Sequence, residues 1–184
     1  MGRRGVLETP EQKLLFILVY QKTYPLQIVM GELFGLSQPS TNQWIHRLWP
    51  ILRSALAALG VKPERAGRKF AQAERWITEP HEYLIDGTDR PRQRPKNPTK
   101  QALHYSGKTK AHSDKNLVIV TRRTKRVGYL SPTYAGKTHD KKLADQERIA
   151  YPRRARLYKD TGFQGYEPKG AQTFQPKKSR AGAR

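Results

Sequence analysis

The apolar positions of the first sixty residues predict a succession of helices. The first begins at Pro10, because Thr9 can cap it and Gln12 lies where a capping box places its reciprocal acceptor. The apolar residues that follow continue to Tyr20. A second, shorter helix is predicted over residues 24–34, where apolar positions recur after a proline.

A third helix after a tight turn completes a helix-turn-helix pattern. Gly35 breaks the second helix, and Ser37 can cap a third one from about 38 to 49, which Pro50 ends or kinks. A glycine turn followed by a helix with polar residues at its start is typical of a DNA recognition helix. The side chains available to bases or phosphate are Gln38, Ser40, Thr41, Asn42, Gln43, His46 and Arg47. The alternative is a plain three-helix bundle with a polar face.

The pattern changes after a predicted boundary at residues 63–68, which a further helical stretch over 51–60 precedes. Short apolar runs typical of strands lie at 83–86, 116–121, 128–131 and 155–159, with a helix from about 139 to 150 before the last. Residues 165–184 have the composition of an unstructured basic tail. The predicted organisation is therefore a helical domain over 1–60, a linker over 61–79 and a mixed domain of strands and helices over 80–184.

The charge balance indicates a polyanionic partner. The chain has 36 Lys and Arg against 15 Asp and Glu, a net charge of +21, which favours nucleic acid through release of counterions. A ribosomal protein or a membrane-surface binder is also basic, so charge assigns the partner class and not the activity. The absence of cysteine excludes disulfides and thiolate zinc sites and favours a reducing cytosol. No run approaches the roughly 18 apolar residues of a membrane span.

Two aspartates each follow a predicted strand and precede a glycine. Asp86 and Gly87 end the run that begins at Glu82, and Asp160 follows the strand at 155–159, with Gly162 after it. A carboxylate at a strand end can leave the sheet and meet a second one from a neighbouring strand. Two such groups suit Mg²⁺, a hard cation that prefers carboxylate and water. The alternative is that aspartate followed by glycine is ordinary turn chemistry.

Four sequence blocks carry a family resemblance. They are Asp86-Gly87-Thr88-Asp89-Arg90-Pro91, Tyr105-Ser106-Gly107-Lys108 with His112, residues 130–140, and residues 160–165. In this order, behind a helix-turn-helix, they resemble the blocks of bacterial insertion-sequence transposases, in particular the group named for insertion sequence five, related to the Harbinger-like transposases of eukaryotes. The resemblance covers nearly the whole chain and implies an RNase H-like mixed sheet after the helix-turn-helix bundle, so the expected fold class is α+β or α/β.

The resemblance also implies a metal-dependent activity. Asp86 and Asp160 would be the first two members of a DDE triad that holds two Mg²⁺, with Mn²⁺ as a substitute, for cleavage and transfer of DNA strands. The third member is normally a glutamate on a later helix, but the only acid after Asp160 is Glu167, beside Pro168. We therefore expect an incomplete, C-terminally truncated catalytic domain. The chain would be a transposase fragment or an inactive DNA-binding remnant that represses transposition.

Other residues near the aspartates are candidates for supporting roles. The segment between Asp89 and Asp114 has no acid, and it would track the phosphate backbone unless it is a solvated loop. Its DNA-binding candidates are Arg90, Arg92, Arg94, Lys108, Lys110 and His112. Asp140 would be a rival metal ligand, a helix cap or the partner of a basic group, and His139 would donate to phosphate. Asp89 is expected outside the strand, where it would support the turn.

The implied partner is double-stranded DNA, as the terminal repeats of the element and as its target. A second copy of the chain would be needed in a synaptic complex that pairs two element ends, and no membrane is involved. The implied location is the bacterial cytoplasm, at the nucleoid. A third class of function, a general RNA- or ribosome-binding basic protein, remains open, and for it the aspartate blocks would be coincidental.

Overall fold

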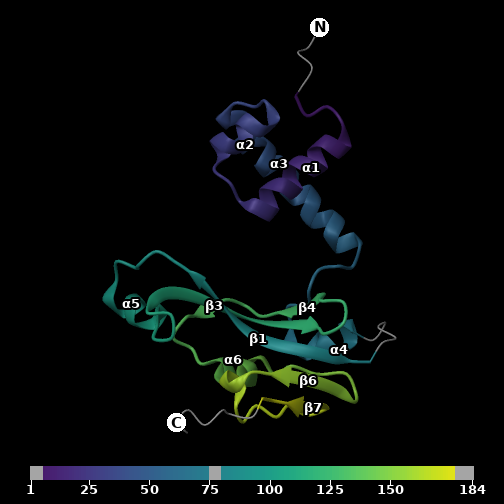
Figure 1. Ribbon diagram of the computed structural model, residues 1–184, viewed down its shortest axis with the longest axis vertical. Helices are drawn as coiled ribbons and strands as arrows, with labels where there is room; N and C mark the ends of the chain where they lie inside the picture. Colours follow the sequence, from purple (N-terminus) through teal and green to yellow (C-terminus); the bar gives the residue numbers. More distant parts are fainter. Residues whose placement is uncertain (1–5, 75–79, 177–184) are drawn as a thin grey trace, which may run out of the picture. The chain divides into compact units, whose positions relative to one another are not determined.

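The computed structural model describes residues 6–74 and 80–176 (Figure 1). The chain divides into two compact units, Met1–Lys62 and Pro63–Arg184. Each unit has its own cluster of buried apolar side chains. Across these described ranges, no helix has both the length and the apolar content that crossing a membrane requires.

The first unit is a bundle of three helices, α1 (Pro10–Thr23), α2 (Gln27–Phe34) and α3 (Gln38–Ala58). The predicted capping box at Thr9 is confirmed, since its side chain accepts from Gln12 N and the Gln12 side chain accepts from Thr9 N. The turn between α2 and α3 contains Gly35 with φ of 64°, and Ser37 caps α3. The buried core of the bundle consists of Leu7, Phe16, Ile17, Met30, Ile45 and Leu48.

The sequence left two effects of Pro50 open, an end of the third helix or a kink in it. An end at Pro50 is wrong, because α3 is one helix of 21 residues with Pro50 inside it. Proline removes only one backbone donor and leaves the rest of the ladder to form. Leu48 before it and Leu52 after it both pack on the helical core, so tertiary contacts hold α3 on both sides of the proline.

The second unit is built on a mixed sheet (Figure 1). Its long central strands are β1 (Glu82–Pro91) and β3 (Ala111–Thr121), which pair antiparallel. On the other side of β1, β6 (Ala155–Lys159) and then β7 (Ala171–Phe174) pair in parallel. The antiparallel partners of β3 are β4 (Val127–Leu130) and the short strands β2 (Tyr105–Ser106) and β5 (Tyr134–Ala135).

Short helices complete this unit. They are η1 (Gly67–Lys69), α4 (Phe70–Ala73), α5 (Pro98–His104), α6 (Asp140–Glu147) and η2 (Thr161–Phe163). The sheet order is β2-β3-β1-β6-β7, and β4 and β5 are further partners of β3. A helical unit followed by this mixed sheet confirms the predicted fold class, a helix-turn-helix bundle with an RNase H-like domain.

The core of the second unit lies on one face of the sheet. Phe70 from α4 and Ala144 from α6 pack there against sheet residues that include Tyr83, Ile85 and Leu157. Since side chains alternate along a strand, the residues between them point to the opposite face. On that face Leu84 remains 37% exposed.

Two features of the second unit differ from the sequence expectations. The first strand does not end at Asp86 in a glycine turn, because β1 continues through Gly87 and Asp89 and pairs with β3 as far as Pro91. Asp89 therefore lies within the strand, where it accepts a hydrogen bond from Ser113 Oγ. The antiparallel partner β3 extends the strand beyond the short apolar run on which the prediction was based.

The expected unstructured tail over 165–184 is also wrong for its described part. Tyr166 is buried, and residues 171–174 form β7 beside β6. The buried Lys159 donates to Tyr166 O and lies 2.6 Å from Glu167 Oε1, which anchors the segment that leads to β7. The polar composition of this segment gave no sign of a strand, because the contacts that stabilise β7 are made with residues earlier in the chain. Residues 177–184 lie outside the described residues.

Residues 63–74, which the sequence analysis included in the linker over 61–79, pack within the second unit. Glu64 forms a bridge with Tyr129 of β4, and Phe70 is fully buried in the core of the sheet. Residues 75–79 lie outside the described residues.

Candidate active site

The parallel register of β1 and β6 brings Asp86 and Asp160 to the same level of the sheet. Ile85 is the partner of Lys159, the last residue of β6, and Asp86 and Asp160 each follow directly after one member of this pair. Because neighbouring positions of parallel strands face the same way, both carboxylates leave the sheet on one face. Both are exposed, and both line an open groove of about 690 Å³ whose apolar wall includes Leu84, Tyr158 and Phe174.

One oxygen of each carboxylate is held by a glycine that follows it. Gly87 N donates to Asp86 Oδ1 at 2.8 Å, and Gly162 N donates to Asp160 Oδ1 at 2.9 Å. In the second case Asp160 is the N-cap of η2, so local helix capping sets its rotamer. Within the part of the chain that the structure describes, neither carboxylate is paired with a cation. Each therefore keeps an oxygen available to a ligand.

The donor set suits a hard cation only in part. In residues 6–74 and 80–176, no group of three or more His, Cys, Asp or Glu side chains is placed to hold a metal ion. Mg²⁺ in nucleotide and nucleic-acid sites is commonly held by one or two carboxylates, with water and substrate phosphate as the other ligands. Asp86 and Asp160 fit that mode of binding.

Asp140 lies behind this pair, at the start of α6. A Cβ atom at position 87 would lie 2.8 Å from Asp140 Cγ, so the Asp140 carboxylate occupies the side of β1 opposite to Asp86. Lys115 Nζ donates to Asp140 Oδ1 at 2.8 Å. The expected contact of Asp140 with a basic group is thus confirmed. Its expected role as a helix cap is wrong, because His139 is the N-cap residue of α6 and makes no side-chain capping bond.

A second cleft, of about 440 Å³, adjoins Asp160 on the side of α6. It is lined by basic side chains of Lys108, Lys137 and His139, together with Thr161 and Gly162. Within the described residues, none of these three basic side chains has a hydrogen-bond or ion-pair partner. Asp160 also lines the 690 Å³ groove, so the two clefts meet at this aspartate.

The predicted basic segment after Asp89 is more ordered than a solvated loop. Arg92 forms an ion pair with Asp114 at 2.8 Å, Arg94 donates to Gln101, and Arg90 donates to Thr133. The three arginines thus connect the end of β1 and the residues after it to β3, to α5 and to the loop between β4 and β5. Of the other candidates, Lys108 and Lys110 are exposed in the turn before β3, and the His112 ring packs edge-on to Tyr105.

Most of the predicted recognition residues are accessible at the start of α3. Gln38, Gln43, His46 and Arg47 are exposed, Ser40 is half-buried, and Asn42 Nδ2 donates to Gln27 Oε1 of α2. Arg47 lies over the Trp44 ring, 5.4 Å from its centroid. Thr41 is a correction, because it is fully buried and cannot reach DNA. A Cβ at Gly31 would lie 3.2 Å from Thr41 Oγ1, so Thr41 packs where α2 and α3 cross.

Two lysines near the site, Lys115 and Lys137, were not predicted from the sequence. Lys115 lies on β3 and is only 6% exposed, and its alternation with apolar neighbours such as Leu117 and Ile119 was the available signal that it points inward. Lys137 belongs to one of the sequence blocks, but a lone lysine in a loop has no local signal of the cleft that it lines.

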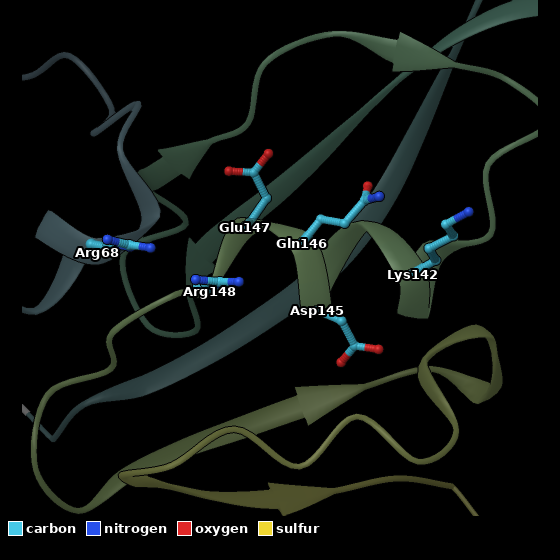
Figure 2. Close-up of a pocket in the computed structure, with 6 residues that line it drawn as sticks. All are labelled: Arg68, Lys142, Asp145, Gln146, Glu147 and Arg148. Atoms are coloured by element: carbon cyan, nitrogen blue, oxygen red, sulfur yellow. The ribbon is translucent and has the colours of Figure 1, made fainter.

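A further cleft of about 470 Å³ lies against α6 and shares no lining residue with the aspartate groove. Figure 2 shows Arg68 of η1 near Glu147 and Arg148 at the C-terminal end of α6. Glu147 accepts hydrogen bonds from Tyr129 and Tyr134, and burial together with this carboxylate raises the pKa of Tyr134 to about 12. Glu147 therefore has structural partners, which sets this cleft apart from the aspartate pair.

The fold and the site define a class of protein, an RNase H-like domain with two carboxylates on neighbouring parallel strands, preceded in the chain by a helix-turn-helix. Comparison with protein families agrees with that class. Residues 85–181 match the family described as DDE superfamily endonuclease, and residues 6–58 match the helix-turn-helix of DDE superfamily endonuclease. The chain belongs to the DDE superfamily endonucleases. No curated protein and no solved structure matches it.

Proposed function

We propose that the chain acts on DNA as a transposase, in the group named for insertion sequence five, with Asp86 and Asp160 as its metal-binding carboxylates. The observation that supports this most directly is the parallel register of β1 and β6, which brings two unpaired, exposed carboxylates to one groove. Membership of the DDE superfamily supports a divalent metal such as Mg²⁺ or Mn²⁺. The bound metal supplies activation of water or a 3′ hydroxyl and stabilisation of the departing oxygen.

The residues of this chain would hold and orient the DNA strand. Asp86 and Asp160 are kept in position by the amides of Gly87 and Gly162. The proposed reaction requires no covalent nucleophile from the protein. The unpaired basic side chains of the 440 Å³ cleft would bind the strand's phosphates beside Asp160. Positioning and electrostatic stabilisation are the main contributions that a protein makes to phosphodiester transfer.

In the same proposal the helical domain, residues 1–60, binds the terminal repeats of the element, and residues 80–184 form most of the catalytic domain. The exposed polar residues at the start of α3 would contact bases, and the net charge of +21 would supply affinity for the backbone. Pairing of two element ends would require a second copy of the chain.

Among the described residues, no third His, Cys, Asp or Glu completes a group with Asp86 and Asp160 that could hold a metal ion, and the nearby Asp140 carboxylate is paired with Lys115. We therefore expect this polypeptide alone to bind DNA but to cut it slowly or not at all. The test is nicking of supercoiled plasmid by the purified 184-residue chain in Mg²⁺ and in Mn²⁺. Efficient cleavage that Asp86→Ala abolishes would contradict this expectation while it supports the metal site.

Binding of Mn²⁺, followed by water proton relaxation, tests the metal site without cleavage. Asp86→Ala and Asp160→Ala are each expected to lower the affinity about tenfold or more, because each removes one of few ligands. Asp145→Ala is a matched control, since Asp145 is exposed on α6 and paired with Lys141. Equal affinities in all four proteins would argue against a metal site at Asp86 and Asp160.

The second candidate function is a DNA-binding protein without catalysis, which occupies element ends and represses transposition. It is favoured because no third His, Cys, Asp or Glu side chain among the described residues joins Asp86 and Asp160 in a group that could hold a metal ion. It predicts sequence-selective DNA binding that Asp160→Ala leaves unchanged, with no cleavage in either metal. Preference for RNA over duplex DNA at fixed salt would instead favour a general RNA-binding protein.

A further inference from the structure

We propose that Asp140 is a positioning residue for the Asp86–Asp160 pair, acting through the two glycines that hold their carboxylates. This inference rests on the proposed function, in which Asp86 and Asp160 bind metal. It assigns a role to Asp140 and to its partner Lys115, neither of which is needed as a metal ligand in the arrangement described above.

The Asp140 carboxylate lies beside both glycines, in or against the space that a Cβ atom would occupy. A Cβ at Gly87 would lie 2.8 Å from Asp140 Cγ, and a Cβ at Gly162 would lie 3.0 Å from Asp140 Oδ2. Real Cβ atoms do not come as close as the first distance, so glycine is required there for this contact to exist. Gly87 belongs to β1 and Gly162 to η2, and one carboxylate therefore spans the two segments that carry the aspartates.

These glycines are also the groups that orient the aspartates. The amide of Gly87 donates to Asp86 Oδ1, and the amide of Gly162 donates to Asp160 Oδ1. A displacement of either glycine toward α6 would meet the Asp140 carboxylate. Contact with Asp140 thus limits the movement of both amides and, through them, of both aspartate side chains. Such supporting contacts commonly affect metal affinity as strongly as some ligands do.

Lys115 fixes the position of Asp140 and offsets its charge. Its ammonium group lies 2.8 Å from Asp140 Oδ1 and 3.9 Å from Asp89 Oδ2, and the residue is 6% exposed. A buried ion pair of this kind holds a defined geometry. Because Lys115 compensates Asp140, the pair of Asp86 and Asp160 is not opposed by a third unpaired carboxylate behind it.

The first test measures the Mn²⁺ affinity of the full chain for Asp140→Ala and Asp140→Asn. Asp140→Ala removes the contact with both glycines and is expected to weaken Mn²⁺ binding about tenfold. Asp140→Asn has the same shape and still accepts from Lys115, so it should restore most of that affinity. An Asn variant as weak as the Ala variant would overturn the proposal, because it would make the charge of Asp140, and hence direct ligation, the cause.

The second test needs no metal. Hydrogen exchange of the Gly87 and Gly162 amides, followed by NMR, is expected to accelerate in Asp140→Ala and to stay near the parental rate in Asp140→Asn. The amide of Ile119, in the buried centre of β3, reports whether the fold is intact. If Asp140→Ala does not fold, Asp140→Ser replaces it, because serine keeps a polar partner for Lys115 but is too short to reach the glycines. Unchanged exchange at both glycines in a folded variant overturns the proposal.

Asp86→Ala separates this proposal from the one on which it rests. Unchanged Mn²⁺ affinity in Asp86→Ala would refute the metal site itself, whatever Asp140 does. Loss of Mn²⁺ binding in Asp86→Ala, together with unchanged affinity and exchange in Asp140→Ala, would refute the positioning role alone.

Discussion

At the scale of single residues, Gly87 illustrates how a contact distant in sequence determines which side chain a position accepts. A glycine after an aspartate is the usual sign of a turn, but Gly87 lies within β1. The reason for glycine is the Asp140 carboxylate, which occupies the space of a Cβ. Local turn chemistry explains Gly162 better, because Gly162 lies in η2 and donates to the capping Asp160.

Gly87→Ala should destabilise the second unit by about 1–3 kcal/mol, since the new methyl group must displace Asp140 from its place beside Lys115. Urea denaturation of the purified chain measures the change. Gly107→Ala is the matched control, because a Cβ at that position meets no atom within 4 Å. Equal stability of the two variants would show that the contact between Gly87 and Asp140 is not tight in solution.

Thr41 was expected on the protein surface that contacts DNA, but it lies in the core of the helical bundle. Its side chain is fully buried, and Thr41 Oγ1 is among the buried atoms without a hydrogen-bond partner. The small Gly31 allows α2 to approach it closely. Thr41 lies four residues before Ile45 and seven before Leu48, so the helical period places it on the buried face, although its polar side chain suggested a contact with DNA.

At the scale of elements, α3 combines a structural and a recognition role. Its Ile45 and Leu48 belong to the helical core, whereas Gln43, His46 and Arg47 are exposed between them. This division follows the helical period, so the accessible recognition residues could be predicted from sequence. The continuation of α3 through Pro50 could not, because it depends on packing.

Arg47→Ala is expected to weaken DNA binding and to reduce the slope of log affinity against log salt by about 1, as for the loss of one phosphate contact. Titration of a fluorescent duplex at several salt concentrations measures both quantities. Arg53→Ala is a suitable control, because Arg53 is exposed on the same helix but six residues further from its start. Identical slopes for the two variants would argue against contact between Arg47 and DNA.

The C-terminal strand is an element that sequence patterns did not reveal. β7 is short and half-buried, and it carries polar residues beside glycine and proline. Its place is secured by pairing with β6, by buried Tyr166 and by the bond of Lys159 to Glu167. The bonds from Lys159 and Thr173 also lower the pKa of Glu167 below its usual value.

At the scale of the whole molecule, the second unit contains several tyrosines that resist ionisation. Burial, with nearby carboxylates or tyrosines, raises the pKa of Tyr83, Tyr129 and Tyr151. Burial also raises the pKa of Tyr134 and that of Tyr166 to about 12. The folded state therefore holds these phenol protons more tightly than the unfolded chain, in which tyrosine has its ordinary pKa near 10.0.

The consequence is a loss of stability in alkali. A raised pKa in the folded state stabilises it fully below the unfolded value, and this contribution is lost as pH rises from 10.0 toward about 12. Denaturant unfolding across that range is expected to show a falling free energy of unfolding. Tyr134→Phe should flatten the fall, because it removes one of the linked groups. If the free energy of unfolding fell with pH equally steeply in Tyr134→Phe, the raised pKa of Tyr134 would be contradicted.

Local patterns in the sequence were sufficient for several parts of this protein: the caps of α1 and α3, the period of the helices, the strands β4 and β6, and the two aspartates that follow apolar runs. Each of these signals lies within a few residues of the feature that it predicts. Their order along the chain predicted a helical domain followed by a mixed domain of strands and helices, and the resemblance of the four sequence blocks implied the RNase H-like class.

Other features depend on residues that are far apart in sequence and meet only in the folded chain. The extension of β1 needs β3, the order of β7 needs β6 and Lys159, and the place of Asp140 needs Lys115 and both glycines. Burial and pairing of this kind override local propensity, because the energies of packing and of satisfied polar groups exceed the small preferences of individual residues.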